Sequence, residues 1–303
     1  MNILTLLLAT AVLAHMDIKK VGNFDYFELT LIYPTSVCRA YNAPTRFVAE
    51  ETTNFCKVPV NTFSWTIHGL WPDRNDGSFP QFCVDKTKRF VLSKLLPIQQ
   101  ELERKWPNLL VLQSVSSLWK HEWEKHGTCA GTVEEVDDEL KYFNRSLALY
   151  EQFNIFGTLE KQGIIPSEKK LYDWLLLHQS LRSAYGKHVE FHCLQDKETK
   201  SWLLADVRLC LTKNFQLMDC KKRPWKWQSS KKSLLTYQPC PADGIIYLPF
   251  NNTHSVNSSI IIILILFLWN HFHLETFLFC FNDDRAHFFF LVSFIYCTAY
   301  NKE

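Results

Sequence analysis

An eleven-residue tract near the middle of the chain, Trp119-Lys-His-Glu-Trp-Glu-Lys-His-Gly-Thr-Cys129, limits the local fold more than any other segment. Successive residues of an α-helix turn by about 100°. In a helix over residues 116–126, four ionisable side chains therefore share one side, namely His121, Glu122, Lys125 and His126. Trp119 and Trp123 lie beyond them and are expected to pack in a core. Glycine commonly follows the last helical turn, so Gly127 is expected to end the helix.

This set of side chains is suited to proton transfer. Histidine titrates near neutrality and serves as a general acid or base, and a nearby lysine stabilises a developing anion. A zinc hydrolase is the rival enzyme class, but its His-Glu-x-x-His motif places the histidines four apart. His121 and His126 are five apart and diverge by about 140° on an ideal helix, which disfavours zinc. A polar surface stripe on an ordinary amphipathic helix is the structural alternative.

A second tract, Ser64-Trp-Thr-Ile-His-Gly-Leu-Trp-Pro-Asp73, places His68 at the end of a β-favouring run, before a break at Gly69 and Pro72. A lone histidine there is more often structural than catalytic. The two tracts together, however, resemble the two active-site segments of the ribonuclease T2 family. The resemblance extends from about Phe24 to Pro249.

The resemblance implies a role for each ionisable residue. His126 is expected to take the proton from the ribose 2′-hydroxyl, and His68 to protonate the departing 5′-oxygen. Lys125 and Glu122 would stabilise the pentacovalent transition state, and His121 would hold the phosphate. The product would be a 2′,3′-cyclic phosphate. One neutral and one protonated histidine are needed together, so activity should be bell-shaped in pH.

The expected substrate is single-stranded RNA, cleaved with little base specificity. DNA should not react because the nucleophile is the 2′-hydroxyl of the substrate. No metal and no other cofactor is expected. Trp71 and Asp73 match base-pocket positions of the family, where an aromatic ring can stack on a base and a carboxylate can accept from an amine. Trp71 could equally be a core residue that holds the turn.

A function from another class is a secreted glycoprotein that acts by binding cells or receptors, with an idle nuclease site. Loss of either catalytic histidine would favour that function, but both motifs are intact. The sequence therefore favours the enzyme, which we expect to be a monomer.

The start of the chain and its ten cysteines indicate export. Residues 1–14 read as a signal peptide cleaved after Ala14, although a positive first segment is missing. Disulfides persist in oxidising compartments, so we expect a secreted protein or one in the lysosomal or endosomal lumen. Glycosylation sequons begin at Asn144, Asn251 and Asn257, and of these Asn144 lies within the expected enzyme. The resemblance further implies four disulfides: Cys38–Cys56, Cys83–Cys129, Cys193–Cys240 and Cys210–Cys220. Cys280 and Cys297 match no family position.

Local periodicity predicts an α+β fold. Expected strands include a run from Phe27 to Tyr33 and the segments 189–194, 202–212 and 245–248. Expected helices occupy about 87–106, 116–126, 137–153 and 172–185. The resemblance implies a mainly antiparallel sheet flanked by helices, stapled by disulfides, over a catalytic domain at 15–250.

Residues 251–303 do not fit that domain. Ile260–Trp269 and Phe288–Tyr300 are apolar runs, each shorter than the ~18–20 residues that cross a bilayer. We expect an appended tail that adds nothing to catalysis, with membrane association as the lesser alternative. The segment from Cys220 to Lys232 interleaves basic residues with Trp225 and Trp227, as a nucleic-acid surface can. A solvated loop is the simpler interpretation, so this segment is not assigned to the site.

Overall fold

The computed structural model describes residues 21–42, 56–83, 89–221 and 235–250, together with the backbone of two short strands near the C-terminus. Those strands, β9 (Phe281–Asn282) and β10 (Arg285–Ala286), pair antiparallel. Internal contacts divide the chain into Met1–Asn251 and Asn252–Glu303. The expected leader, most of the basic segment after Cys220, and the sequons at Asn251 and Asn257 lie outside the described residues. So do the two apolar runs of the tail and Cys280 and Cys297.

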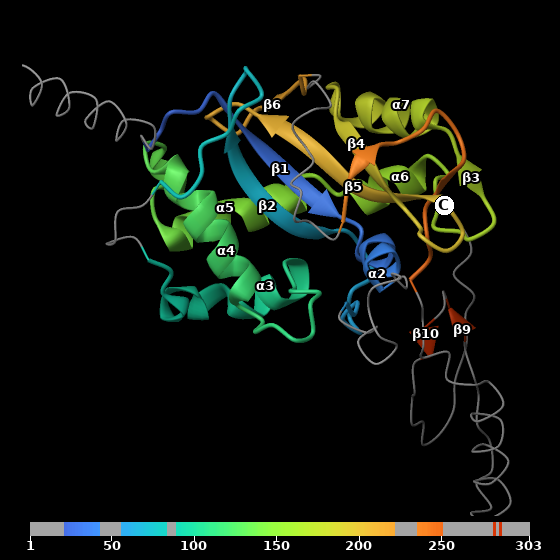
Figure 1. Cartoon of the computed structure of the whole chain (residues 1–303), viewed down its shortest axis with the longest axis horizontal. Coiled ribbons are helices and arrows are strands. Elements are labelled where there is room, and N and C mark those ends of the chain that lie inside the picture. The colour runs from blue at the N-terminus through green and yellow to red at the C-terminus, as the bar shows by residue number, and fades with distance from the viewer. Residues whose placement is uncertain are drawn as a thin grey trace, which may run out of the picture. The chain divides into compact units, whose positions relative to one another are not determined.

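A mainly antiparallel sheet runs through the first unit (Figure 1). Its main path is β2 (Thr66–Asp73), β1 (Tyr26–Ile32), β5 (Trp202–Leu211), β4 (Glu190–Gln195) and β7 (Gln238–Pro239). Three short strands extend it: β3 (Leu171–Tyr172), β6 (Leu217–Met218) and β8 (Ile245–Ile246). The pairing of β5 with β8 is parallel, and the other pairings are antiparallel. The expected α+β class with a mainly antiparallel sheet is confirmed.

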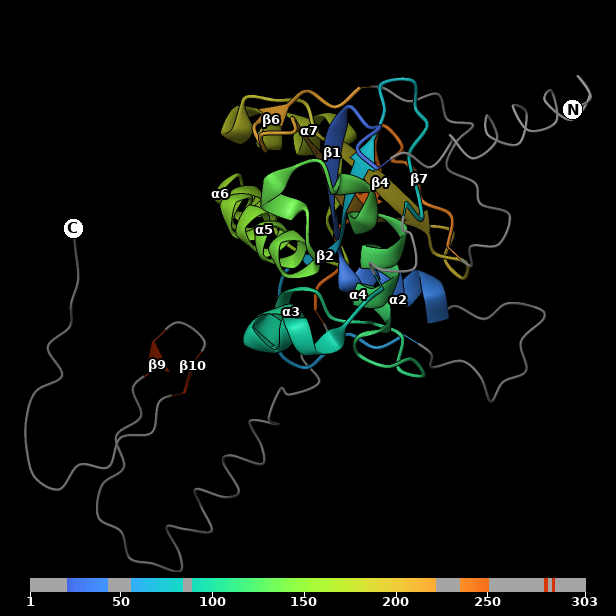
Figure 2. The ribbon, with the colours of Figure 1, turned by 90° about the vertical axis from the view of Figure 1, so that its left-hand side faces the viewer.

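Helices flank the sheet (Figures 1 and 2). They are α2 (Pro34–Asn42), α3 (Gln99–Lys105), α4 (Ser117–Lys125), α5 (Glu139–Gln152), α6 (Ile155–Lys161) and α7 (Trp174–Tyr185). Shorter 3₁₀ turns are η3 (Leu92–Ile98), η4 (Gly127–Ala130) and η5 (Glu134–Val136). Because side chains alternate across a strand, Phe27, Leu29 and Leu31 of β1 share one face. That face packs in the main core with residues of α3 to α7.

The opposite face of the sheet is different in character. Near one end, Ile32 and Ala205 pack against Val37 and Cys38 of α2 in a small second core. Farther along, the same face carries the buried polar residues Glu28, Thr30, Asp206, Arg208 and His192. One sheet face therefore makes the main core, and the other combines a small second core with buried polar and charged groups.

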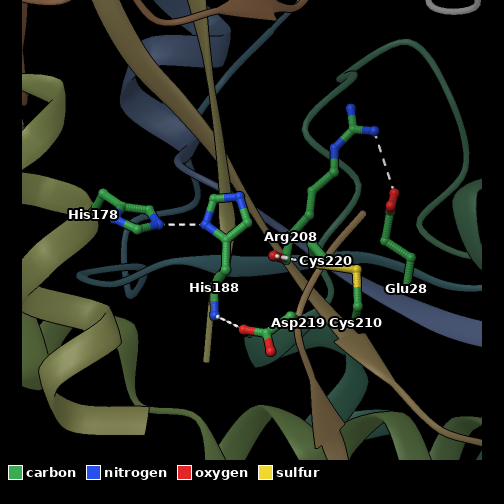
Figure 3. The surroundings of a disulfide bond; sticks show 7 residues. All are labelled: Glu28, His178, His188, Arg208, Cys210, Asp219 and Cys220. Atoms are coloured by element: carbon green, nitrogen blue, oxygen red, sulfur yellow. Dashed lines mark hydrogen bonds and ion pairs between the residues drawn. A yellow bond between two sulfur atoms is a disulfide. The ribbon is translucent and has the colours of Figure 1, made fainter. Parts of the chain in front are cut away.

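The eight cysteines of the first unit pair as the family resemblance implies: Cys38–Cys56, Cys83–Cys129, Cys193–Cys240 and Cys210–Cys220. Figure 3 shows the surroundings of the last pair, where His178 of α7 hydrogen-bonds to His188. Asp219 accepts a hydrogen bond of 2.7 Å from the backbone N–H of His188. These contacts tie α7 to the segment that leads into β4. Within the described residues, no helix is both long and apolar enough to cross a membrane.

Two expected elements were wrong in detail. The helix expected over 87–106 is a 3₁₀ turn, η3, followed by the short helix α3. Pro97 lies inside η3, where it supplies no backbone N–H for a regular helix. The break expected after His68 is absent, because β2 continues through Gly69 and Pro72 to Asp73. Proline is tolerated there since β2 ends the main path of the sheet. The helices α2 and α6 were not predicted.

Candidate active site

A β-bulge in β2 aims His68 at the site. Thr30 of β1 faces Gly69, whereas the next residue, Leu31, faces Ile67, so His68 is the extra residue of β2. In a regular strand, residues three apart point to opposite faces. The bulge cancels that alternation, and His68 and Trp71 share one side with ring centroids 5.1 Å apart.

Residues of the helical layer hold the bulged segment from behind. The Trp106 indole Nε1 donates to the His68 carbonyl oxygen at 2.9 Å. The hydroxyl of Tyr142, on α5, donates to the Leu70 carbonyl oxygen at 2.9 Å. Backbone groups next to the bulge therefore keep their hydrogen bonds, as buried backbone requires.

Helix α4 brings the second motif to the same place. Trp119 and Trp123 are buried in the core, as expected. Glu122 is also buried, with 1% of its side chain exposed, and it lies beside β2. Its Oε2 accepts a hydrogen bond of 2.7 Å from Trp71 Nε1, and its Oε1 lies 4.0 Å from His68 Nε2. The two motifs therefore meet at the carboxyl group of Glu122.

Gly69 permits this meeting. A Cβ at position 69 would lie 2.1 Å from Trp71 Nε1 and 2.4 Å from Glu122 Oε2. Neither approach is possible for a real side chain, so any larger residue would push apart the groups that form the site. The sequence shows this glycine but gives no sign of the contact that requires it.

His126 lies just beyond the end of α4. Its ring stacks on Trp71, with centroids 5.2 Å apart and planes 29° apart. The side chain is buried, and its Nδ1 has no hydrogen-bond partner among the described residues. A buried imidazole nitrogen without a partner can accept a proton from a bound group.

Helix α4 ends before Gly127, as expected. The chain then tightens into the 3₁₀ turn η4, Gly127–Ala130. A Cβ at Gly127 would lie 2.5 Å from Trp123 Cε3, so the glycine provides room for the tryptophan. Two contacts join a neighbouring loop to this segment. One is the Cys83–Cys129 disulfide, and the other is a hydrogen bond of 2.8 Å from the Phe82 N–H to the Lys125 carbonyl oxygen. His126 thus lies between two residues, Lys125 and Cys129, that are each bonded to this loop.

Burial controls the charge of the acid at the centre. It raises the pKa of Glu122 to about 8, although the Trp71 hydrogen bond and the Lys125 ammonium both lower that pKa. A carboxyl group of this kind holds its proton at mildly acidic pH. Glu122 can then donate a hydrogen bond as well as accept one.

The histidines are shifted in the opposite direction. Burial, followed by the positive charge of Lys125, holds the pKa of His126 well below its usual range. The same two causes lower the pKa of the exposed His121. Loss of solvation lowers the pKa of His68 to about 4, and the Asp206 carboxylate opposes this shift. In the unliganded protein, His68 and His126 therefore favour the neutral form near pH 6.

The expected base-pocket residues differ in their surroundings. Trp71 is half-buried between the rings of His68 and His126. Asp73 is buried at the end of β2, where its Oδ1 accepts a 2.7 Å hydrogen bond from Arg74 N–H. That contact stabilises the following turn. Phe79, which the sequence did not single out, is 40% exposed and lies 6.4 Å from the His126 ring. An exposed ring there can stack on a base.

Three side chains lie close enough to share a cation. One ligand atom from each of His121, Glu122 and His126 falls within 4.8 Å of the others. The expected divergence of the two histidines does not hold, because His126 lies at the C-cap, with φ −116° and ψ −55°. Glu122, however, already accepts a hydrogen bond from Trp71, and its raised pKa favours a proton on the carboxyl group.

The expected glycosylation site, Asn144, is exposed on α5. The third residue of its sequon, Ser146, is buried and hydrogen-bonds to the Tyr142 carbonyl oxygen at 2.8 Å. Asn144 is therefore accessible on the surface, whereas the rest of its sequon belongs to the folded helix.

Comparison with known proteins gives a consistent assignment. A model of the Ribonuclease T2 family matches residues 24–220. The ribonuclease T2 protein rnst-2 of Caenorhabditis elegans is 37% identical over 247 residues, which cover 78% of this chain and 85% of that protein. Human ribonuclease T2 is 32% identical over 235 residues, which cover 76% of this chain and 83% of the human protein.

Solved structures agree with the sequence relatives. The crystal structure of human RNase T2 matches with a TM-score of 0.56 and 28% identity, covering 75% of this chain and 99% of that chain. RNase NT, solved in complex with 5′-AMP, matches with a TM-score of 0.60 and 25% identity, covering 75% and 100%. The chain is therefore a member of the ribonuclease T2 family of RNA endonucleases.

Proposed function

We propose that this enzyme cleaves single-stranded RNA by transphosphorylation, with His68 and His126 as its proton-transfer pair. The observation that carries the proposal is the position of Trp71. Its ring contacts His68 on one side and His126 on another, and its N–H contacts Glu122. Groups from two distant motifs thus gather around the Trp71 ring, and we place the reacting phosphodiester beside them.

In the proposed reaction, His126 takes the proton of the ribose 2′-hydroxyl. The 2′-oxygen forms a bond to phosphorus while the bond from phosphorus to the 5′-oxygen breaks, and His68 delivers its proton to that leaving oxygen. The products are a 2′,3′-cyclic phosphate and a free 5′-hydroxyl. The lowered pKa of His126 suits a base that is neutral before it acts.

His68 must carry a proton before it acts as the acid. Its pKa is low in the unliganded protein, but an adjacent phosphodiester anion favours the charged imidazole. Substrate binding and protonation of His68 therefore support one another. This coupling favours activity at mildly acidic pH.

The remaining groups stabilise charge on the phosphate. Protonated Glu122 donates to a non-bridging oxygen of the phosphate, and His121 binds the phosphate from the exposed side. The Lys125 ammonium, which lies near enough to lower the pKa of Glu122, stabilises the negative charge. Together these groups supply the proton transfers and charge stabilisation of the reaction, so we propose a mechanism without a metal.

The substrate base is proposed to lie against Trp71 and Phe79, with Asp73 at the edge of the pocket. Stacking accepts any base, so we propose little base specificity. The related RNase NT structure holds 5′-AMP, which is consistent with a nucleotide pocket in this fold. We further propose a monomeric enzyme of the secretory pathway or the lysosomal or endosomal lumen, glycosylated at Asn144.

The deciding experiment is incubation of the purified protein with a single-stranded RNA, with and without chelator, followed by analysis of the product ends. We expect 2′,3′-cyclic phosphate ends at equal rates in both conditions. A DNA strand of the same sequence is the control and should remain intact. Chelator-sensitive cleavage, or products with 3′-hydroxyl ends, would contradict the proposed mechanism.

A further inference from the structure

A buried charged network lies on the sheet face that carries the catalytic groups. Arg208, on β5, donates from Nη1 to Glu28 at 3.2 Å, as Figure 3 shows. Its Nη2 and Nε donate to Asp206 Oδ2 at 3.0 Å and 3.2 Å. Asp206 also contacts His192 Nδ1 at 2.7 Å. The side chains of Glu28 and Asp206 are each 1% exposed and that of Arg208 is 9% exposed.

The strand register places this network next to the catalytic bulge. Glu28 of β1 is directly opposite Trp71 of β2. Thr30 is opposite Gly69 on one side and Arg208 on the other. A row across three strands therefore leads from the bulge to Arg208, and the guanidinium carbon lies over the Trp71 ring at 5.8 Å from its centroid.

Trp71 in turn contacts the reacting groups. Its N–H donates to Glu122 at 2.7 Å, its face stacks on His126, and its edge meets His68. A small rotation of the indole would move it relative to all three groups. In catalysis a misplacement of about 1 Å can cost about 100-fold in rate, so the orientation of this ring matters.

We propose that Arg208 is a positioning residue for catalysis, clamped by Glu28 and Asp206 and acting through Trp71. The inference rests on the proposed function, since it assumes that His68, Glu122 and His126 perform the chemistry. Arginine suits the role because its planar fork binds two carboxylates while its face packs on an aromatic ring, which a lysine cannot reproduce. Its donors are engaged by carboxylates and its side chain is buried, so it is poorly placed to bind RNA phosphate.

Arg208→Lys tests the proposal while keeping the charge. Arg145→Lys is the matched control, because Arg145 on α5 also lies over an aromatic ring, that of Phe215, at 4.6 Å. We expect Arg208→Lys to lower kcat by about tenfold and to leave KM within about twofold. Arg145→Lys should leave both constants unchanged. Circular dichroism establishes that each variant is folded.

A spectroscopic readout follows the proposed intermediary directly. The Trp71 Nε1–H signal, identified in ¹⁵N-tryptophan spectra by its loss in Trp71→Phe, should shift in Arg208→Lys and stay in place in Arg145→Lys. If Arg208→Lys does not fold, Glu28→Gln provides the second test, because it loosens the clamp and keeps Arg208. It should shift the same signal and lower kcat with little change in KM.

Two results would overturn the proposal. One is wild-type kcat and an unchanged Trp71 signal in the folded variant. The other is a raised KM in Arg208→Lys, together with a weaker salt dependence of RNA binding. A slope of log affinity against log salt concentration that is smaller by about one would identify Arg208 as a phosphate contact. Wild-type enzyme and His126→Phe are assayed in parallel. Cyclic-phosphate production by the first and not the second would keep the proposed function intact whatever the Arg208 result.

Discussion

The indole N–H of Trp71 donates a 2.7 Å hydrogen bond to the buried carboxyl group of Glu122. This bond joins the strand that carries His68 to the helix that leads into His126. It also lowers the pKa of Glu122, against the larger effect of burial.

Trp71→Phe should keep the ring contacts and remove the N–H. The pKa of Glu122 is then expected to rise further, because the hydrogen bond that lowers it is lost. We expect kcat to fall by up to about tenfold, since a hydrogen bond to the neutral, protonated carboxyl group is worth about 0.5–1.5 kcal/mol. A pH profile of kcat measures both effects. Trp65→Phe is the control, because it loses a comparable bond, to the Tyr247 hydroxyl at 3.0 Å, away from the site.

Glu122→Gln should change how stability depends on pH. The pKa of Glu122 is raised in the fold from 4.5 to about 8, so the fold favours the protonated form. The stabilising contribution of the protonated Glu122 carboxyl group is present below pH 4.5 and is lost as the pH rises through about 8. The neutral glutamine avoids this loss. The free energy of unfolding of the variant, relative to that of the wild type, should therefore rise by more than about 1 kcal/mol between pH 5 and pH 8.

Chemical denaturation at the two pH values measures this difference. Glu124→Gln, on the same helix, is the control for the change in helix charge. Equal pH dependence in wild type and Glu122→Gln would show that the carboxyl group is not desolvated as described. The activity of Glu122→Gln should also fall, because an amide is a weaker donor to the phosphate than a carboxylic acid.

Replacement of either His68 or His126 by Phe should lower turnover by about 10²–10⁴-fold while the fold survives. Initial rates on single-stranded RNA, with circular dichroism for folding, measure this loss. His178→Gln serves as control, since His178 is buried beside Trp174 and His188 and takes no part in the proposed reaction. Near-normal cleavage by a folded His126→Phe variant would be incompatible with the assigned roles.

Activity should be greatest below about pH 6.5, the usual pKa of histidine. The pKa of His126 is well below that value, so the base is neutral in mild acid. His68 must be protonated to act as the acid, so activity is lost as the pH rises. Its low pKa in the unliganded protein moves this loss toward lower pH. A profile of kcat/KM between pH 3 and pH 9 tests this expectation. An alkaline optimum would contradict it.

Truncation after Asn252 should leave ribonuclease activity and thermal stability unchanged. The last disulfide of the first unit closes at Cys240, and internal contacts separate the chain between Asn251 and Asn252. Solubility should improve, because apolar runs are removed. Activity assays and thermal melts of the two chains make the comparison. Misfolding of the short form would indicate that the tail packs on the enzyme, and detergent-dependent extraction of the long form alone would indicate an anchor.

The sequence by itself identified the family, the fold class and the residues proposed to react. It could do so because His68, Glu122, Lys125 and His126 lie in two long, unusual motifs, and because alternation in β1, β4 and β5 shows directly in the pattern of apolar residues. Helix lengths were less predictable where a single residue altered the backbone, as Pro97 did in η3.

Only the tertiary structure decided how those groups are oriented. The bulge at His68 depends on the register between β2 and β1, which no local pattern encodes. The pairing of Arg208 with Glu28 joins residues 180 positions apart, and the strong pKa shifts of Glu122 and His126 come from burial by other segments. Local sequence determines which side chains are available, whereas register and desolvation arise from contacts between distant parts of the chain.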